Sequence, residues 1–289
     1  MRIDQMLQTF AYGDAIGNDV IAIQKALKEE GYESRIYASE IDSRINCEDV
    51  FPSDEYENGD ILLYHASTGC ELNHLYSSFD TRKWIIFHNV TDPIFFMKDD
   101  PDSARRCENG INEITAMKEE TEVCIADSSF NKSCLEDMGF TCPIEVVPIL
   151  IDFDSYNEEA NIELINKYKD DGYTNILFTG RVAPNKKHED CIEAFYYYKK
   201  YINPKSRLFL VGGYVEEGNY YKRLKEYVSL LEVDDVIFTG HIPFKDILAY
   251  YELADVFLCM SEHEGFCVPL VEAMHFNVPI IAYNSTAIP

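Results

Sequence analysis

Short apolar segments alternate with longer amphipathic segments along the chain. The runs Ile61–His65 and Trp84–His88 are almost wholly apolar, as is typical of strands that a parallel sheet buries on both faces. The run Asp19–Glu30 has apolar residues at helical spacing and is followed by Gly31, a residue type that often ends a helix. Because such strands and helices alternate, the pattern predicts an α/β protein with parallel sheets and right-handed crossovers.

Two such series follow one another, separated by the segment Pro148–Asn157. They predict two doubly wound, Rossmann-like domains that face each other across a cleft, with ligands at the carboxyl ends of the strands. We place the first domain at residues 1–150, a linker and connecting helix (Glu158–Lys169) within 151–170, and the second domain at 171–289. Only a short loop follows the last predicted strand, Pro279–Ala282, so we expect the second domain to be incomplete and the chain to be C-terminally truncated.

The chain carries 51 acidic and 25 basic residues, a net charge of −26. Such a charge repels phosphate backbones and anionic lipid headgroups, so we expect no nucleic-acid partner and at most peripheral membrane contact. Ten of the basic residues fall between Arg181 and Lys225. This concentration indicates a binding site for a small anion, and the alternative interpretation is a solvated surface with scattered lysines.

The nine cysteines show no spacing typical of a disulfide framework, and the N-terminus has no signal-peptide pattern. We therefore expect reduced thiols and a cytoplasmic location. Cys259, His263 and Cys267 lack the paired cysteines of zinc sites, so we expect no metal ion there. No segment has the roughly 20 apolar residues of a membrane span.

The stretch SEHEGFCVPLVEAM (261–274) leads from a predicted strand into a helix predicted to begin at Pro269. Glu264 lies in the loop, Gly265 allows the main chain to approach a ligand closely, and Glu272 is expected in the first helical turn. The helix N-terminus favours an anion. Two carboxylates so spaced suit an elongated ligand; the alternative is a helix-dipole acid beside a solvated loop glutamate.

The stretch FTGRVAPNKKHEDCIEAF (178–195) carries Arg181 at a predicted strand end, and Lys186 and Lys187 just before a predicted helix. Neither element needs these cations, whereas guanidinium and ammonium groups suit a diphosphate. His88 ends another predicted strand, where a histidine can donate to a ligand or cap its own loop. The early turn AYGDAIGND lacks the glycine pattern of dinucleotide-binding folds.

The segment EHEGFCVPLVEA, followed by the apolar run VPIIAY, resembles the signature of retaining glycosyltransferases with the GT-B fold. More narrowly, it resembles the family called glycosyltransferase group 1, which includes mannosyl-, glucosyl- and rhamnosyltransferases. In that family the first glutamate contacts hydroxyls of the transferred sugar and the second contacts the ribose of the donor. The resemblance implies these roles for Glu264 and Glu272, and donor contacts for Gly265 and Phe266. The usual pattern has glycine where this chain has Cys267.

The family element G-R-x(4,5)-K implies that Arg181 and one lysine hold the donor diphosphate and stabilise its departure. The spacing fits Lys186, whereas Asp190 in the following helix favours Lys187, to which we assign the catalytic role. The family also has a histidine that matches His88, near the reactive face of the sugar.

Two further donor contacts are implied by the resemblance. Gly17 lies in the early turn AYGDAIGND, expected to be a flexible loop near the donor sugar and phosphate. Ile242 lies in GHIPFKD, where the family reads the nucleotide base with main-chain groups.

The resemblance implies an enzyme of polysaccharide biosynthesis that moves a hexose-type sugar from a nucleoside-diphosphate sugar to a glycan or lipid-linked acceptor, with retention of configuration. It implies no cofactor and no metal ion. The first domain would hold the acceptor, and its loops at 47–58, 69–79 and 92–102 are acidic without a motif. The alternatives are a non-catalytic nucleotide-sugar-binding or partner protein of the same fold, a nucleotide-sugar epimerase, and a phosphorylase.

Overall fold

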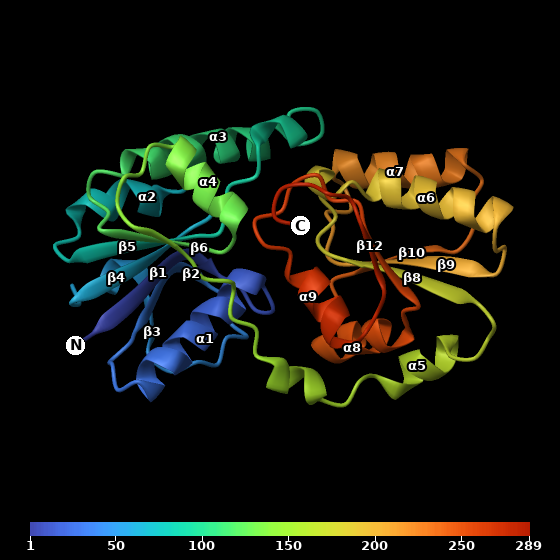
Figure 1. Cartoon of the computed structure of the whole chain (residues 1–289), viewed down its shortest axis with the longest axis horizontal. Helices are drawn as coiled ribbons and strands as arrows, with labels where there is room; N and C mark the ends of the chain where they lie inside the picture. The colour runs from blue at the N-terminus through green and yellow to red at the C-terminus, as the bar shows by residue number, and fades with distance from the viewer. The chain divides into compact units, whose positions relative to one another are not determined.

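The computed structural model describes residues 1–289 as two compact units, each built on its own parallel sheet (Figure 1). Unit 1 consists of Met1–Pro93 and Asp102–Asp152, and unit 2 consists of Ile94–Pro101 and Phe153–Pro289. The sequence pattern assigns Ile94–Pro101 to the first domain, but the segment packs with unit 2, where Asp99 pairs with Arg223 at 2.7 Å. The two parallel sheets confirm the predicted α/β fold class.

Unit 1 has a seven-stranded sheet in the order β3-β2-β1-β4-β5-β6-β7, with every pair parallel. The first strand lies between the second and the fourth, so the winding of the chain reverses there, which is where sheets of this kind bind ligands. All six side chains of β4 are buried, which agrees with its continuous apolar sequence. The strands are β1 (Ile3–Phe10), β2 (Ile36–Ile41), β3 (Val50–Pro52), β4 (Ile61–Ala66), β5 (Arg82–Phe87), β6 (Val123–Ala126) and β7 (Ile144–Val146).

The helices of unit 1 are α1 (Ala15–Glu29), α2 (Glu71–Leu75), α3 (Pro101–Ala116) and α4 (Ser129–Asp137). The sequence pattern did not indicate β3 or α2, which lie in two of the segments interpreted as acidic loops. Both are too short to show a period of their own. The three residues of β3 become a strand only through pairing with β2, as in the register of Ile36 with Val50.

Unit 2 has a five-stranded parallel sheet in the order β10-β9-β8-β11-β12, so its winding reverses between β8 and β11. The strands are β8 (Thr174–Thr179), β9 (Ser206–Val211), β10 (Val236–Gly240), β11 (Val256–Cys259) and β12 (Ile280–Ala282). The helices are α5 (Ile162–Tyr168), α6 (His188–Tyr201), α7 (Asn219–Leu230), α8 (Phe244–Leu253) and α9 (Val268–His275).

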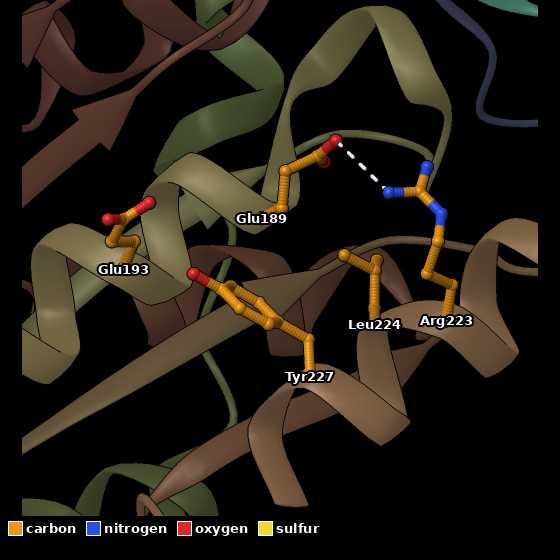
Figure 2. A pocket seen from close by; sticks show the side chains of 5 residues that line it. All are labelled: Glu189, Glu193, Arg223, Leu224 and Tyr227. Atoms are coloured by element: carbon orange, nitrogen blue, oxygen red, sulfur yellow. Dashed lines mark ion pairs between the residues drawn. The ribbon is translucent and has the colours of Figure 1, made fainter. Parts of the chain in front are cut away.

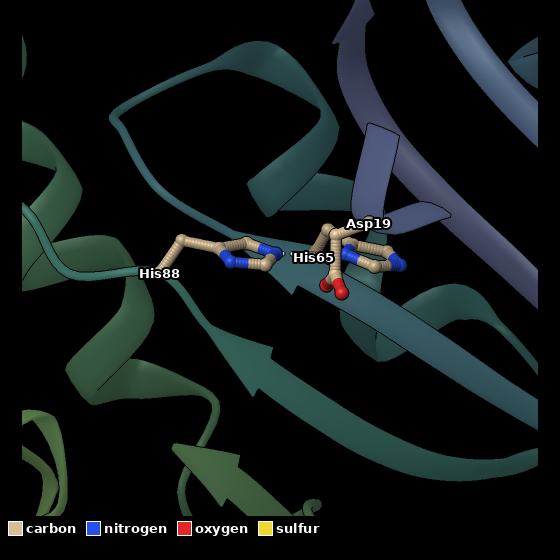
Figure 3. Close-up of side chains that lie close together, drawn as sticks. All are labelled: Asp19, His65 and His88. Atoms are coloured by element: carbon tan, nitrogen blue, oxygen red, sulfur yellow. Dashed lines mark hydrogen bonds between the residues drawn. The ribbon is translucent and has the colours of Figure 1, made fainter. Parts of the chain in front are cut away.

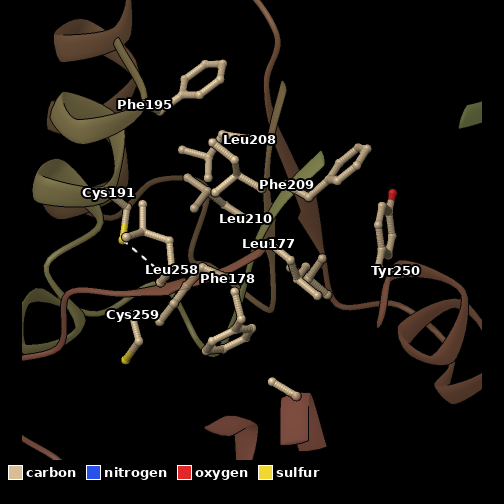
Figure 4. Packing of buried hydrophobic residues seen from close by; sticks show 14 of the residues in the cluster. Leu177, Phe178, Cys191, Phe195, Leu208, Phe209, Leu210, Tyr250, Leu258 and Cys259 are labelled. Atoms are coloured by element: carbon tan, nitrogen blue, oxygen red, sulfur yellow. Dashed lines mark hydrogen bonds between the residues drawn. The ribbon is translucent and has the colours of Figure 1, made fainter. Parts of the chain in front are cut away.

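The core of unit 2 forms where helices cover this sheet (Figure 4). Leu177, Phe209 and Leu258 come from three neighbouring strands, and Cys191 and Phe195 come from α6; all five are buried. This packing fixes the strand ends that carry the polar loops described below.

The connecting helix is shorter than the sequence pattern predicts. It begins at Ile162 because Asn161 caps it: the side-chain oxygen accepts from the main-chain N–H groups of Glu163 at 3.1 Å and Leu164 at 3.2 Å. None of the helices in either unit combines the length and the hydropathy that a bilayer-crossing helix needs.

Candidate functional site

The loops that follow β8 and β11 are tied together at the point where the winding of unit 2 reverses. The N–H of Glu262 donates to the carbonyl of Asn185 at 2.9 Å. The side-chain amide of Asn185 donates to the carbonyl of His263 at 3.0 Å, and Asn185 itself is buried. These bonds fix the loop that carries the lysine pair against the loop that carries Glu264.

Lys186 and Glu264 form an ion pair across these two loops. The Nζ of Lys186 lies 2.5 Å from Oε2 of Glu264, and their side chains are 23% and 7% exposed. The N–H of Glu264 donates to the hydroxyl of Thr286 at 2.9 Å. Because the pair is short and largely shielded from solvent, each charged group takes the place of the water molecules that the other loses on burial. The ion pair therefore holds both side chains in one geometry.

Lys187 lies in a different environment from Lys186. It adopts the left-handed conformation, with φ of 52°, where the chain turns into α6. Its Nζ lies 3.6–3.9 Å from the carboxylates of Glu189, Asp190 and Glu262. Its main chain thus makes a turn that glycine makes at lower cost, and its charge is engaged by surface acids and not by Glu264.

Arg181 is exposed and takes part in no ion pair. It follows Gly180, where the main chain comes very close to Gly212 after β9. A Cβ on Gly212 would lie 2.1 Å from the carbonyl oxygen of Gly180, and Gly212 has φ of 149°. The pair Gly212-Gly213 is a part of this site that the sequence analysis missed, although two adjacent glycines at a strand end are a usable signal.

Glu272 is buried and held by two tyrosines. The hydroxyl of Tyr251 donates to Oε2 at 2.6 Å, and the hydroxyl of Tyr156 donates to Oε1 at 2.6 Å. Burial raises the pKa of Glu272, and the two phenol hydrogen bonds partly offset that rise. Neither tyrosine was predicted, because nothing in the local sequence relates Tyr156 or Tyr251 to a residue of α9.

Glu272 does not lie in the first turn of its helix, as the sequence analysis expected. The helix α9 begins at Val268, one residue before Pro269, and no acidic residue lies in its first turn. The earlier start follows from Cys267, which adopts the left-handed conformation with φ of 77° and serves as the N-cap without a side-chain cap. The side chain of Cys267 therefore satisfies none of the first N–H groups of α9.

Cys259, Glu264 and Cys267 bring their ligand atoms within 4.8 Å of one another. His263, the histidine considered in the sequence analysis, is not in this group. The carboxylate of Glu264 already pairs with Lys186. The thiol hydrogen bond with Cys267 lowers the pKa of Cys259 to about 7, against the effect of burial.

The remaining predicted donor contacts of unit 2 lie on loops. Gly265 and Phe266 are half-buried between Glu264 and α9. Ile242 is half-buried two residues beyond β10 and packs against the core of unit 2.

In unit 1, His88 is the first residue after β5 and its ring nitrogens are both engaged. Nδ1 lies 2.8 Å from Oδ2 of Asp127, and Nε2 lies 2.8 Å from Nδ1 of His65. The side chain is 2% exposed, whereas the residue as a whole is half-buried, so its accessible surface belongs to the main chain. His88 thus lies at the predicted strand end, and both of its ring nitrogens are engaged by protein groups.

Gly17 lies inside α1, not in a flexible loop as the sequence analysis expected. A Cβ at this position would lie 2.6 Å from the carbonyl oxygen of Ala11, so the helix can approach the preceding turn only with glycine here. The turn itself is made by Gly13, with φ of 73°.

A small cavity of about 290 Å³ lies between α6 and α7 of unit 2, lined by Glu189, Glu193, Arg223, Leu224 and Tyr227 (Figure 2). An ion pair of 3.6 Å joins Arg223 to Glu189 at its rim. None of the predicted donor residues lines it.

These features define the class of protein. Both units are Rossmann-like α/β domains, and solved structures of GT-B glycosyltransferases share their arrangement of elements. Anabaena Alr3699/HepE, solved in complex with UDP-glucose, matches with a TM-score of 0.74 at 16% identity, over 99% of this chain and 81% of that chain. At this identity the likeness shows the fold alone.

Residues 161–289 match the family model described as "Glycosyl transferases group 1". The match lies within the second unit. It is 26% identical over 175 residues to an uncharacterized 41.2 kDa protein in the cps region of Klebsiella pneumoniae, a match that covers 60% of this chain and 46% of that protein. It is 33% identical over 111 residues to mannosylfructose-phosphate synthase of Agrobacterium fabrum, covering 37% of this chain and 24% of that protein. The chain thus spans half or less of these relatives.

Proposed function

We propose that this chain is a glycosyltransferase that takes a sugar from a nucleoside-diphosphate donor and transfers it with retention of configuration to a glycan or lipid-linked acceptor. The observation that carries the proposal is the pairing of Lys186 with Glu264 at the reversal point of unit 2. A cation and a carboxylate at this point match the two ends of a sugar diphosphate. The match of residues 161–289 to the group 1 family model supports the same assignment.

Positive charge for the leaving diphosphate comes from Arg181, Lys186 and the N-terminus of α9 in this proposal. Arg181 is exposed and without an ion pair, so it can offer its planar fork to phosphate oxygens. We assign the catalytic lysine to Lys186 in place of Lys187, because Lys186 faces Glu264 whereas Lys187 faces three surface acids. Stabilising the developing charge in this way needs no metal ion.

Glu264 would accept hydrogen bonds from hydroxyls of the transferred sugar, and Glu272 from the ribose. Without a donor, both carboxylates are held by protein groups: Glu264 by Lys186, and Glu272 by Tyr156 and Tyr251. Donor binding would exchange these partners, with Lys186 turning to the diphosphate. The bonds that orient the carboxylates in the free protein thus give way to bonds to the substrate.

The remaining donor contacts are proposed from loop positions. Gly265 and Phe266 would line the sugar beside Glu264, and Ile242 would contact the base through its main chain. In unit 1 we propose that the main chain of His88, and not its imidazole, takes part in substrate binding. Gly17 would act indirectly, by allowing α1 to pack closely on the turn before it.

The test is a donor screen followed by a transfer assay. Thermal shift across GDP-, UDP- and dTDP-sugars identifies the donor, and release of nucleoside diphosphate is then measured with and without chelator. We expect turnover that survives the chelator, an α-configured product from an α-linked donor, and loss of turnover in Glu264→Ala. Full activity of Glu264→Ala would refute the assignment of this site. Donor binding without turnover would favour a non-catalytic sugar-nucleotide-binding protein.

A further inference from the structure

Unit 1 contains a buried row of polar side chains that includes both His65 and His88 (Figure 3). Nδ1 of His65 lies 2.8 Å from Nε2 of His88. At one end of the row, Nε2 of His65 lies 3.1 Å from Oε1 of Gln5; at the other, Nδ1 of His88 lies 2.8 Å from Oδ2 of Asp127. Gln5, His65 and Asp127 are buried, as is the side chain of His88. The row thus crosses the sheet from Gln5 in β1 to Asp127 just after β6.

The partners at each end of the row fix the positions of the protons. The amide Nε2 of Gln5 donates to the carbonyl of Val20 at 3.0 Å, so its Oε1 faces His65 and Nε2 of His65 carries a proton. Nδ1 of His88 faces a carboxylate and carries a proton as well. If both rings were neutral, their remaining lone pairs would face each other at 2.8 Å. One further proton therefore lies between the two rings.

The geometry of the rings fits a proton and not a metal ion. The ring centroids are 5.1 Å apart, and the ring planes are 8° from parallel. The two facing nitrogens are 2.8 Å apart, which is 2.3 Å less than the distance between the centroids. This difference is about the sum of the two distances from a ring centre to its nitrogen. The rings thus lie edge to edge in nearly one plane, with the lone pairs on a common line. A metal ion on that line needs about 2.0 Å to each nitrogen, more than the 2.8 Å gap allows.

The surrounding carboxylates place the charge on His88. Burial opposes a charge there, but Asp127, which also accepts a hydrogen bond, together with Asp19 and Asp14, raises the pKa of His88 above its ordinary value. Burial lowers the pKa of His65 well below its ordinary value. A carboxylate oxygen of Asp19 lies within 4.8 Å of one nitrogen of each ring, and its carboxylate accepts from the N–H of Leu150 at 2.8 Å. Burial raises the pKa of Asp19 to about 6, so it is an anion at neutral pH.

We propose that His65 is a positioning residue that accepts a hydrogen bond from an imidazolium at His88 and so fixes the main chain of His88 at the edge of the sheet. When alkaline pH removes the shared proton, two lone pairs face each other and the rings must separate. The main chain at His88 then loses its fixed position. The consequence for sugar transfer rests on the proposed function; the protonation itself does not.

The direct test is ¹⁵N NMR of the whole chain with labelled histidine, at pH 7 and without substrate. We expect His88 to carry protons on both nitrogens and His65 to carry one on Nε2 alone. Asp127→Asn should leave His88 neutral at the same pH. A neutral His88 in the unaltered protein would overturn the proposal. Because no substrate is present, this result stands whether or not the chain transfers sugar.

A second test compares two substitutions of His65 with a matched histidine elsewhere in unit 1. His65→Asn keeps an oxygen near the position of Nδ1 that can accept from His88, whereas His65→Leu cannot accept. The control is His74→Leu, since the side chain of His74 is 67% exposed. We expect the charge on His88 in the spectra to persist in His65→Asn and the control, and to be lost in His65→Leu.

Transfer kinetics supply the functional readout of the same variants. We expect the alkaline limb of kcat/KM to move to lower pH by about one unit in His65→Leu, which is about a tenfold loss at pH 8. His65→Asn and His74→Leu should keep the limb of the unaltered protein. An unmoved limb in His65→Leu, or no recovery in His65→Asn, would overturn the positioning role.

Discussion

The two adjacent lysines of the β8 loop give the sharpest prediction, because we propose opposite roles for them. Lys186→Met removes the cation that faces Glu264 across 2.5 Å. Lys187→Gly removes a cation that faces only surface acids, and it replaces a residue whose φ is 52° with one suited to that conformation. The first substitution should lower the rate of transfer roughly 10²–10³-fold, and the second should retain it.

The loss expected for Lys186→Met has two parts. Loss of one preorganised charge from a developing diphosphate costs roughly 10²–10³ in kcat. The substitution also leaves the carboxylate of Glu264, whose side chain is 7% exposed, without its cation. An unpaired buried charge of this kind lowers the free energy of unfolding by about 2 kcal/mol.

For Lys187→Gly the contributions to the free energy of unfolding nearly cancel. The left-handed conformation costs a non-glycine residue roughly 1–2 kcal/mol, and glycine returns about 0.4–1 kcal/mol through the greater freedom of the unfolded chain. The contacts of Lys187 with three acids are long, at 3.6–3.9 Å, and pairs of this kind contribute about 0–1 kcal/mol. We expect Lys187→Gly to unfold within about 1 kcal/mol of the unaltered protein.

The matched control is Lys187→Ala, which removes the same charge but keeps a Cβ in the left-handed conformation. It should be less stable than Lys187→Gly by about 1 kcal/mol and equally active. Urea unfolding and nucleoside diphosphate release are measured on all three variants. If Lys187→Gly loses transfer as Lys186→Met does, the assignment of the catalytic lysine to Lys186 is wrong.

Three further predictions concern single side chains. Tyr251→Phe removes a 2.6 Å hydrogen bond to the buried carboxylate of Glu272 and should weaken nucleoside diphosphate binding, measured by calorimetry, by about 1.5–3 kcal/mol. Burial lowers the pKa of His188 to about 3 from 6.5. The stability that its neutral form contributes is fully present above pH 6.5 and is lost as the pH falls toward 3, by about 5 kcal/mol in total. His188→Phe should flatten this dependence in acid titrations followed by circular dichroism. Gly17→Ala places a Cβ 2.6 Å from the carbonyl oxygen of Ala11 and should destabilise unit 1 by about 1–3 kcal/mol, seen in the fluorescence of the single tryptophan.

Each of these three has its own control and its own contrary result. Tyr250→Phe, a neighbour of Tyr251 with no bond to Glu272 in the structure, should bind nucleoside diphosphate normally; equal losses would mean that the phenol of Tyr251 acts only through packing. An unchanged acid profile in His188→Phe would remove that histidine as the cause. Gly13→Ala meets no atom within 4 Å but places a Cβ on a residue with φ of 73°, so it measures main-chain strain alone; unchanged stability of Gly17→Ala would refute the clash.

Much of the fold could be predicted from the sequence, because buried parallel strands consist of short runs of apolar residues. The boundaries of α6 and α8 agree with the structure, and β11 lies where its apolar run predicts. The short β3 and α2 could not be predicted, since pairing and packing with distant residues create them. The same holds for the segment 94–101, whose place in unit 2 depends on contacts such as that of Asp99 with Arg223.

For the candidate site, the sequence by itself determined which residue types stand at the strand ends: Glu264 and Arg181 in unit 2, and His88 in unit 1. Their spacing along the chain was enough to predict that the residues within each unit lie at one edge of its sheet, because the carboxyl ends of parallel strands meet there. Only the tertiary structure decided the partners of these residues. It placed Lys186 against Glu264, and it turned both nitrogens of His88 inward. Hydrogen bonds and ion pairs depend on positions in space within a few tenths of an ångström, which no local pattern of residues specifies.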